Sequence, residues 1–325
     1  MKYFLRRLSL VFFAWVFALI ILFFLPRLMP VGPEALLADR FRLPEEAVLL
    51  MRKEFGLDLP ITTQLLRFLQ NVVFKFPPDF GYSYINYPVR VKDIILSHLP
   101  WTVYLMMSSL MVTFLLGSVT GIIAAWKRGT KLEGILSLLA IFCLSSPVFW
   151  LSYILIIVFA FVFRVFPPAG AYSVTITSTF SLQFIGSVLR HSVLPMLAIV
   201  LTQAPSYFLL VRDNMSLVFK EDYVITAMAK GVKERTIVFK HVARNALLPA
   251  VSLFGTQVGL MLGGQIMVEA VFSYPGVGKL IVDAILGLDY PVVIGFFYII
   301  ITLGIIMSIV TDFVYVIIDP RVRYG

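Results

Sequence analysis

The sequence predicts an all-α, polytopic membrane protein with six transmembrane helices. Hydrophobic residues make up 60% of its 325 residues and charged residues only 14%, whereas a soluble domain averages about 45–50% and about 25%. Six apolar runs reach the length of about 20 residues that a helix needs to cross a bilayer. They are too long and too uniformly apolar for barrel strands, which alternate over about ten residues. Disorder, a soluble enzyme and a disulfide scaffold are therefore excluded, the last because Cys143 is the only cysteine.

The six runs define the expected organisation of the chain. Residues 1–28 form an N-terminal end and the first span, residues 29–100 an extracytoplasmic segment, and residues 101–325 a five-helix transmembrane core. The first run resembles a signal peptide, but no small-x-small cleavage site follows it, so we expect a retained anchor. The five spans of the core are expected at residues 101–126, 135–163, 193–211, 247–268 and 292–318.

Basic residues predict the orientation of these spans. Three of them precede span one, and the segments 127–134 and 212–246 are also rich in lysine and arginine. The segments 164–192 and 273–291 carry few. Because cytoplasmic loops hold the excess of positive charge, both termini are expected in the cytoplasm. The formal net charge of +9 is then mainly an orientation signal, and nucleic acid is not an expected partner.

Two polar segments are long enough to have roles of their own. In the outer segment, 29–100, residues 44–55 and 62–74 are helix-compatible, and the segment either caps the bundle or docks an external partner. The inner segment, 212–246, is predicted to be helical over 223–229, to stop or bend at Gly231, and to be helical again until Pro249. It either lies on anionic lipid as an amphipathic helix or docks a soluble partner.

No motif for an energy source or for catalysis is visible. The sequence contains no phosphate-binding G-x-x-x-x-G-K-[ST] loop, no metal-ligand spacing and no nucleophile motif, so we expect neither catalytic residues nor a metal or other cofactor in this chain. Charged pairs in the middle of a span are absent; Glu269 and Asp312 lie toward span ends. An ion-coupled secondary transporter and a polytopic membrane enzyme are the disfavoured alternatives. The chain looks like a pathway whose free energy comes from elsewhere.

Several polar side chains fall in or beside the apolar runs. They either line a translocation pathway or form hydrogen bonds between helices. The candidates are Gln203, Ser252, Gln257, Gln265 and Glu269.

The inner segment resembles the "EAA" coupling loop of ABC importer permeases. Residues 222–231 read D-Y-x-x-x-A-x-A-K-G and residues 241–249 read H-x-x-x-N-A-x-x-P, the form found in the dipeptide/oligopeptide family. Ile225 stands where the general motif has glutamate. Further blocks resemble this family and its B-type permease subunit in particular; they lie at residues 56–60, 80–83, 88–89, 99–102, 145–149, 166–170, 263–264, 268–272, 274–278, 289–291 and 319–321.

The resemblance implies a type I ABC importer-like permease in the plasma (inner) membrane of a prokaryote. It implies a heterodimer with a second, homologous permease, two cytoplasmic ATPase subunits that bind ATP and Mg²⁺, and an extracytoplasmic substrate-binding protein. Substrates of the family include peptides, oligosaccharides and metal chelates. The implied ATPase-coupling residues are Asp222, Tyr223, Ala227, Ala229, Lys230, Gly231, His241, Asn245 and Pro249. Small residues such as Ala227 and Ala229 are expected to let the short helix sit in a cleft of the ATPase.

Overall fold

The computed structural model describes residues 2–28, 44–54, 56–75, 77–175, 181–260 and 265–318. Within these residues the regular structure is helical, apart from an isolated antiparallel bridge between Tyr82 and Arg90. The chain divides into two compact units. The first comprises residues 1–100 and 276–325, and the second comprises residues 101–275. The blocks at residues 263–264 and 319–321 lie outside the described residues.

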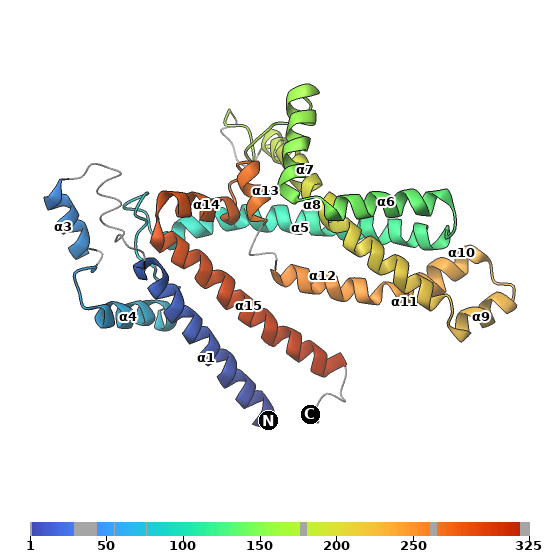
Figure 1. Cartoon of the computed structure of the whole chain (residues 1–325), viewed down its shortest axis with the longest axis horizontal. Coiled ribbons are helices and arrows are strands. Elements are labelled where there is room, and N and C mark those ends of the chain that lie inside the picture. The colour runs from blue at the N-terminus through green and yellow to red at the C-terminus, as the bar shows by residue number, and fades with distance from the viewer. Residues whose placement is uncertain are drawn as a thin grey trace. The chain divides into compact units, whose positions relative to one another are not determined.

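The first unit joins the two ends of the chain. Its helices α1 and α15 lie side by side (Figure 1), and Trp15 Nε1 donates a hydrogen bond of 3.0 Å to Thr302 Oγ1 between them. Leu19, Leu22 and Tyr298 form a small apolar core with Val72. The elements of this unit are α1 (Lys2–Phe24), a 3₁₀ turn (Leu25–Leu28), α3 (Glu45–Glu54), α4 (Ile61–Leu69) with a π-helical turn (Gln70–Phe74), α14 (Val277–Gly287) and α15 (Tyr290–Ile318). The two helices predicted within residues 44–55 and 62–74 are thereby confirmed.

The second unit is organised around two long helices, α5 (Val91–Trp126), which begins in the first unit, and α8 (Leu182–Val218). A Cβ at Gly117 would lie 2.5 Å from the carbonyl oxygen of Ala204, and one at Gly121 2.7 Å from that of Phe208. The helices therefore pack backbone against backbone, as small residues four apart allow. The other elements are α6 (Lys131–Ser145), α7 (Val148–Leu155), a π-helical turn (Ile156–Val162), α9 (Asp222–Ala229), α10 (Glu234–Thr236), a π-helical turn (Ile237–Val242), α11 (Ala243–Ala246), α12 (Leu248–Leu260) and α13 (Ile266–Val271).

Apolar helices occur in all six predicted runs. Among the described residues, α5 and α8 are each long and apolar enough to cross a membrane. Two bent helix pairs, Lys131–Ser145 with Val148–Val162 and Glu234–Ala246 with Leu248–Gly259, pass the same test together, and Ser9–Phe24 and Tyr290–Ile306 are shorter apolar helices. These helices agree with a polytopic membrane protein.

The third run is not the single straight span expected over residues 135–163. The chain bends by 105° between α6 and α7. The bend falls at Ser146, whose backbone is extended (φ −86°, ψ 128°) and which precedes Pro147. A proline disfavours the helical conformation of the residue before it, so α6 ends there. Ser146 Oγ donates to the carbonyl oxygen of Phe142 at 2.8 Å and so satisfies one of the acceptors that the break leaves.

Other helices extend beyond the apolar runs that predicted them. Helix α5 begins at Val91, well before the expected residue 101, and continues through Pro100. Helix α8 spans Leu182–Val218 instead of residues 193–211. Helix α14 lies in the segment 273–291, for which no helix was predicted. Apolar length measures the bilayer core, whereas helical hydrogen bonding continues into polar surroundings, so these helix ends do not coincide with the ends of the apolar runs.

Candidate functional site

The inner segment, residues 212–246, contains the short helix α9 between α8 and α10. We call residues 212–246 the coupling segment. Helix α9 ends at Ala229, and Gly231 then adopts a left-handed backbone conformation with φ 72°. The N–H groups of Gly231 and Val232 donate to the carbonyl oxygens of Met228 (2.9 Å) and Ala227 (3.3 Å). This is the common way in which a glycine ends a helix, and the predicted stop at Gly231 is confirmed.

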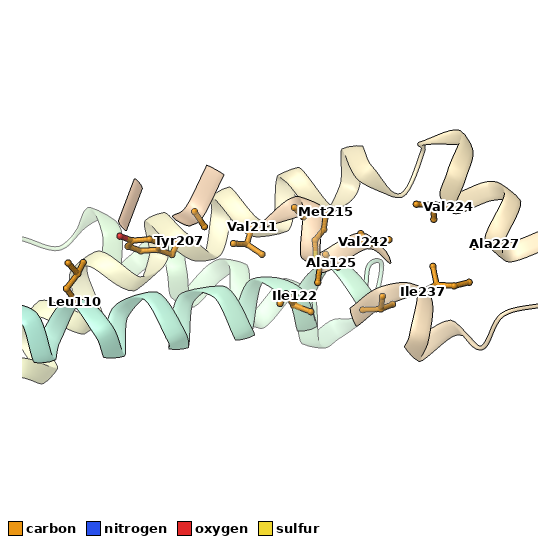
Figure 2. Packing of buried hydrophobic residues seen from close by; sticks show 14 residues of the cluster. Leu110, Ile122, Ala125, Tyr207, Val211, Met215, Val224, Ala227, Ile237 and Val242 are labelled. Atoms are coloured by element: carbon orange, nitrogen blue, oxygen red, sulfur yellow. The ribbon is translucent and has the colours of Figure 1, made fainter. Parts of the chain in front are cut away.

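One face of α9 packs into the core of the second unit. Val224 is fully buried and Ala227 is 9% exposed. The labelled side chains of their cluster follow α5 and α8 from Leu110 and Tyr207 to this helix (Figure 2). The buried members of the cluster are Leu110, Ile122, Ala125, Tyr207, Val211, Met215, Val224, Ala227, Ile237, Val238, Val242, Ala243, Ala246 and Ala250. Apolar burial therefore fixes α9 within this cluster, where it packs against the π-helical turn Ile237–Val242.

This packing changes the explanation given for Ala227. The sequence suggested that Ala227 and Ala229 are small so that α9 can enter a cleft of a partner. Ala227 is instead enclosed by the chain's own side chains, whereas Ala229 is exposed. Residues two positions apart on a helix point in different directions, which is why the two alanines separate. Only Ala229 lies on a face that a partner can reach.

Polar contacts attach the coupling segment at its edges. Asn245 Nδ2 donates to Tyr223 Oη at 2.7 Å, and Tyr223 Oη donates to the carbonyl oxygen of His241 at 3.4 Å. Three of the residues predicted from the sequence are thus brought together. Trp126 Nε1, at the end of α5, donates to Glu234 Oε1 at 2.7 Å, and its ring packs edge-on against Phe239. The pair Trp126 and Glu234 was not predicted, because 108 residues separate them and no local pattern links them.

The remaining surface of α9 is open. Ile225 is 53% exposed and Met228 is 48% exposed. They are three positions apart and so form one apolar strip on the helix surface. Asp222, Ala229 and Lys230 are also exposed, as are Gly231 and Pro249. The coupling segment therefore presents a short helix with a mixed apolar and polar face, held from behind by an apolar core.

The five candidate pathway residues differ in their surroundings. Gln203 on α8, Gln257 on α12 and Gln265 before α13 are half-buried. Ser252 donates to the carbonyl oxygen of Leu248 within its own helix at 3.2 Å. Glu269 is fully buried, and Thr102 Oγ1 donates to its Oε1 at 2.8 Å. Glu269 thus joins α13 to α5 inside the second unit.

The helical, apolar fold and two family models define a class, the membrane-embedded permease subunits of ABC-type importers. The family model described as binding-protein-dependent transport system inner membrane component matches residues 117–324. The model for the N-terminal part of this membrane component matches residues 1–106. The chain belongs to the family of binding-protein-dependent transport system inner membrane components. It is a multi-pass inner-membrane subunit of an importer, in which ATP hydrolysis is the task of separate subunits.

Relatives of similar length carry names that agree with this family. The chain is 35% identical over 324 residues to a putative peptide permease protein of Brucella suis biovar 1, covering 99% of each chain. It is 32% identical over 299 residues to the oligopeptide transport system permease protein AppB of Bacillus subtilis, covering 92% of this chain and 90% of the relative. It is 31% identical over 322 residues to a probable peptide ABC transporter permease protein of Sinorhizobium fredii, covering 99% of each.

Proposed function

We propose that this chain forms half of the translocation pathway of an ATP-driven importer of peptides, and that the coupling segment is its contact with an ATPase subunit. The observation that carries the proposal is the architecture of α9: Val224 and Ala227 anchor it in an apolar cluster that continues along α5 and α8, while Ile225 and Met228 remain exposed. A helix that is fixed from behind and open in front can transmit a push from a soluble partner to the long helices. The names of the relatives support peptides as the substrate class over oligosaccharides or metal chelates.

The proposed assembly contains a second, homologous permease, two ATPase subunits that bind ATP and Mg²⁺, and an extracytoplasmic binding protein. Both termini and the coupling segment are in the cytoplasm, and residues 29–100 are outside. The coupling residues are those of the two sequence blocks, 222–231 and 241–249, with Trp126 and Glu234 as added positioning residues. Gln203, Ser252, Gln257 and Gln265 remain the candidates for contact with the solute.

The test is purification of the intact complex, followed by uptake measurements in proteoliposomes. We expect ATPase subunits to co-purify, and a labelled mixed oligopeptide to accumulate inside the vesicles in an ATP-dependent manner. A labelled maltooligosaccharide is the comparison solute, and its transport in place of the peptide would contradict the substrate class. The chain without its partners should hydrolyse no ATP.

The orientation has its own test. A cysteine at Arg52, in the exposed part of α3, or at Lys75 should react with an impermeant thiol reagent in intact cells. Reaction only after lysis would reverse the proposed topology.

A further inference from the structure

Two sequence blocks that the coupling segment does not explain meet inside the first unit. Asp289 follows α14, and residues 82–90 precede α5. Asp289 is 2% exposed and Ser83 is fully buried. The Asp289 carboxylate accepts a hydrogen bond from Ser83 Oγ, one of 3.0 Å from the N–H of Tyr84 and one of 3.4 Å from the N–H of Ile85. A buried carboxylate is thus bound by three donors from one loop.

The backbone of Asp289 is fixed on both sides. Its N–H donates to the carbonyl oxygen of Ala284 in α14 at 2.8 Å, and its own carbonyl oxygen accepts from the N–H of Val293 in α15 at 3.1 Å. An aspartate at this position before a helix ordinarily caps the helix's own N–H groups. Here its carboxylate reaches the 82–90 loop. The loop is therefore fastened to the junction between α14 and α15.

The 82–90 loop is ordered by its own contacts as well. Ser83 Oγ accepts from the N–H of Asn86 at 2.9 Å, and the N–H of Ser83 donates to the carbonyl oxygen of Val89 at 3.0 Å. Ser83 therefore connects Asp289 to both halves of the loop. The Tyr82 and Tyr87 rings pack edge-on with their centroids 5.7 Å apart.

The tip of this loop is exposed although its base is buried. Ile85 is 37% exposed, Tyr87 51% and Val89 44%. Tyrosine and arginine are enriched in protein interfaces, and Arg90 is also exposed in this loop. A loop that is ordered before binding loses less conformational entropy when a partner docks on it. The buried base and the exposed tip together describe a rigid projection.

We propose that Asp289 is a positioning residue, which holds the 82–90 loop in the shape that the extracytoplasmic binding protein contacts. This inference rests on the proposed function, because it requires that binding protein and the outward orientation of residues 29–100. Asp289 itself touches no partner; it acts through Ser83 and the backbone of residues 84 and 85. It also links the loop to α15, so that a partner seated on Tyr87 is mechanically connected to a long apolar helix.

The experiment uses the assembled importer in lipid nanodiscs, with its purified binding protein loaded from a tryptic digest of casein. The ATPase rate is measured without binding protein and against rising concentrations of it, for wild type, Asp289→Asn and the control Asp283→Asn. Asparagine keeps the size of the side chain but replaces one acceptor oxygen by a donor. Asp283 is an exposed aspartate of the same unit, on α14, paired with Lys279.

We expect Asp289→Asn to raise the half-stimulating concentration of binding protein about tenfold, a factor that corresponds to about 1.4 kcal/mol. The basal rate and the maximal stimulated rate should stay close to wild type, as should all values for Asp283→Asn. Tyr87→Ser at the loop tip should also raise the half-stimulating concentration, and its effect should shrink in the Asp289→Asn background, because both changes act through the same loop.

Four outcomes overturn the inference. An unchanged half-stimulating concentration in Asp289→Asn does so directly. If the basal rate, the maximal rate and the complex yield of Asp289→Asn fall together, Asp289 supports folding in general. If Asp289→Asn yields no complex, a wild-type half-stimulating concentration for Tyr87→Ser shows that the binding protein does not contact the 82–90 loop. Failure of the wild-type complex to respond to any binding protein overturns the proposed function and this inference with it.

Discussion

The coupling segment and the 82–90 loop are both short connections held by distant residues, but different forces hold them. Behind α9 the contacts are apolar: Val224 and Ala227 are buried, and the polar pairs Tyr223–Asn245 and Trp126–Glu234 lie at the exposed edge. At the base of the 82–90 loop the contact is polar, and its two principal side chains, Asp289 and Ser83, are buried. Loss of a buried hydrogen-bond partner costs more than loss of an exposed one.

The comparison predicts opposite sensitivities. The coupling segment should be sensitive to changes of side-chain volume and backbone conformation, and tolerant of lost polar groups. The 82–90 loop should lose its order when a single oxygen is removed. The predictions below run from the largest expected effect to the smallest.

The largest effect is expected for Ala227→Trp. An indole has no room in the buried cluster that encloses Ala227, and overpacking of a core costs about 1–3 kcal/mol, occasionally more. We expect α9 to leave its place on the core, with loss of ATPase co-purification, of transport and of thermal stability in detergent.

The matched control for this change is Ala229→Trp, on the exposed face of the same helix. It should leave thermal stability unchanged and impair only co-purification with the ATPase. Equal loss of stability in both variants would contradict the assignment of a buried and an open face.

Gly231→Val should have the next largest effect. The left-handed backbone conformation costs an L-residue about 1–2 kcal/mol, and a β-branched side chain resists it most strongly. Uptake and substrate-stimulated ATPase activity should fall well below wild type, although the permease still inserts and pairs with its partner permease. Lys233→Ala, a change of an exposed charge two positions later, should be mild. Wild-type transport by Gly231→Val together with loss of transport by Lys233→Ala would reverse this order.

Ser83→Ala tests the polar side of the comparison. It removes the hydroxyl that donates to Asp289 and accepts from Asn86, and it leaves a buried acceptor short of one donor, at a cost of about 1–3 kcal/mol. We expect faster hydrogen exchange of the N–H groups of residues 84–86, measured by mass spectrometry. Ser97→Ala is the control, since the contacts of Ser97 Oγ, with the carbonyl oxygen of Ile94 and with His98 Nδ1, stay within its own helix turn. Exchange there that rises as much as at 84–86 would show that the Asp289 contact is not special.

Tyr223→Phe should have the smallest effect. The lost hydrogen bond with Asn245 lies at the edge of the coupling segment, and a typical net contribution is about 0.5–1.5 kcal/mol, with the lower end expected where water can replace the partner. Transport should remain above about half of the wild-type rate, in line with that lower end. A loss as large as that of Ala227→Trp would show that polar contacts, and not the apolar core, hold α9.

Local features of the sequence determined the class of this protein and much of its helical layout. The six apolar runs, the helices α3 and α4, the end of α9 at Gly231 and the start of α12 beside Pro249 all follow from composition, from helix propensity or from the restricted backbones of glycine and proline. The same local rule, applied to Ser146 and Pro147, explains the bend in the third run, although apolarity alone suggested one straight span. The motif at 222–231 and 241–249 also indicated that Tyr223, His241 and Asn245 belong to one site.

Only the tertiary structure decided which side of α9 is buried, and hence that Ala227 and Ala229 have different roles. It alone paired Trp126 with Glu234, Thr102 with Glu269 and Ser83 with Asp289, across 108, 167 and 206 residues. The physical reason is the range of the forces involved. Apolarity and backbone preference act over a few neighbouring residues and can be seen in the sequence, whereas burial and the pairing of polar groups depend on which distant segment fills the space beside them.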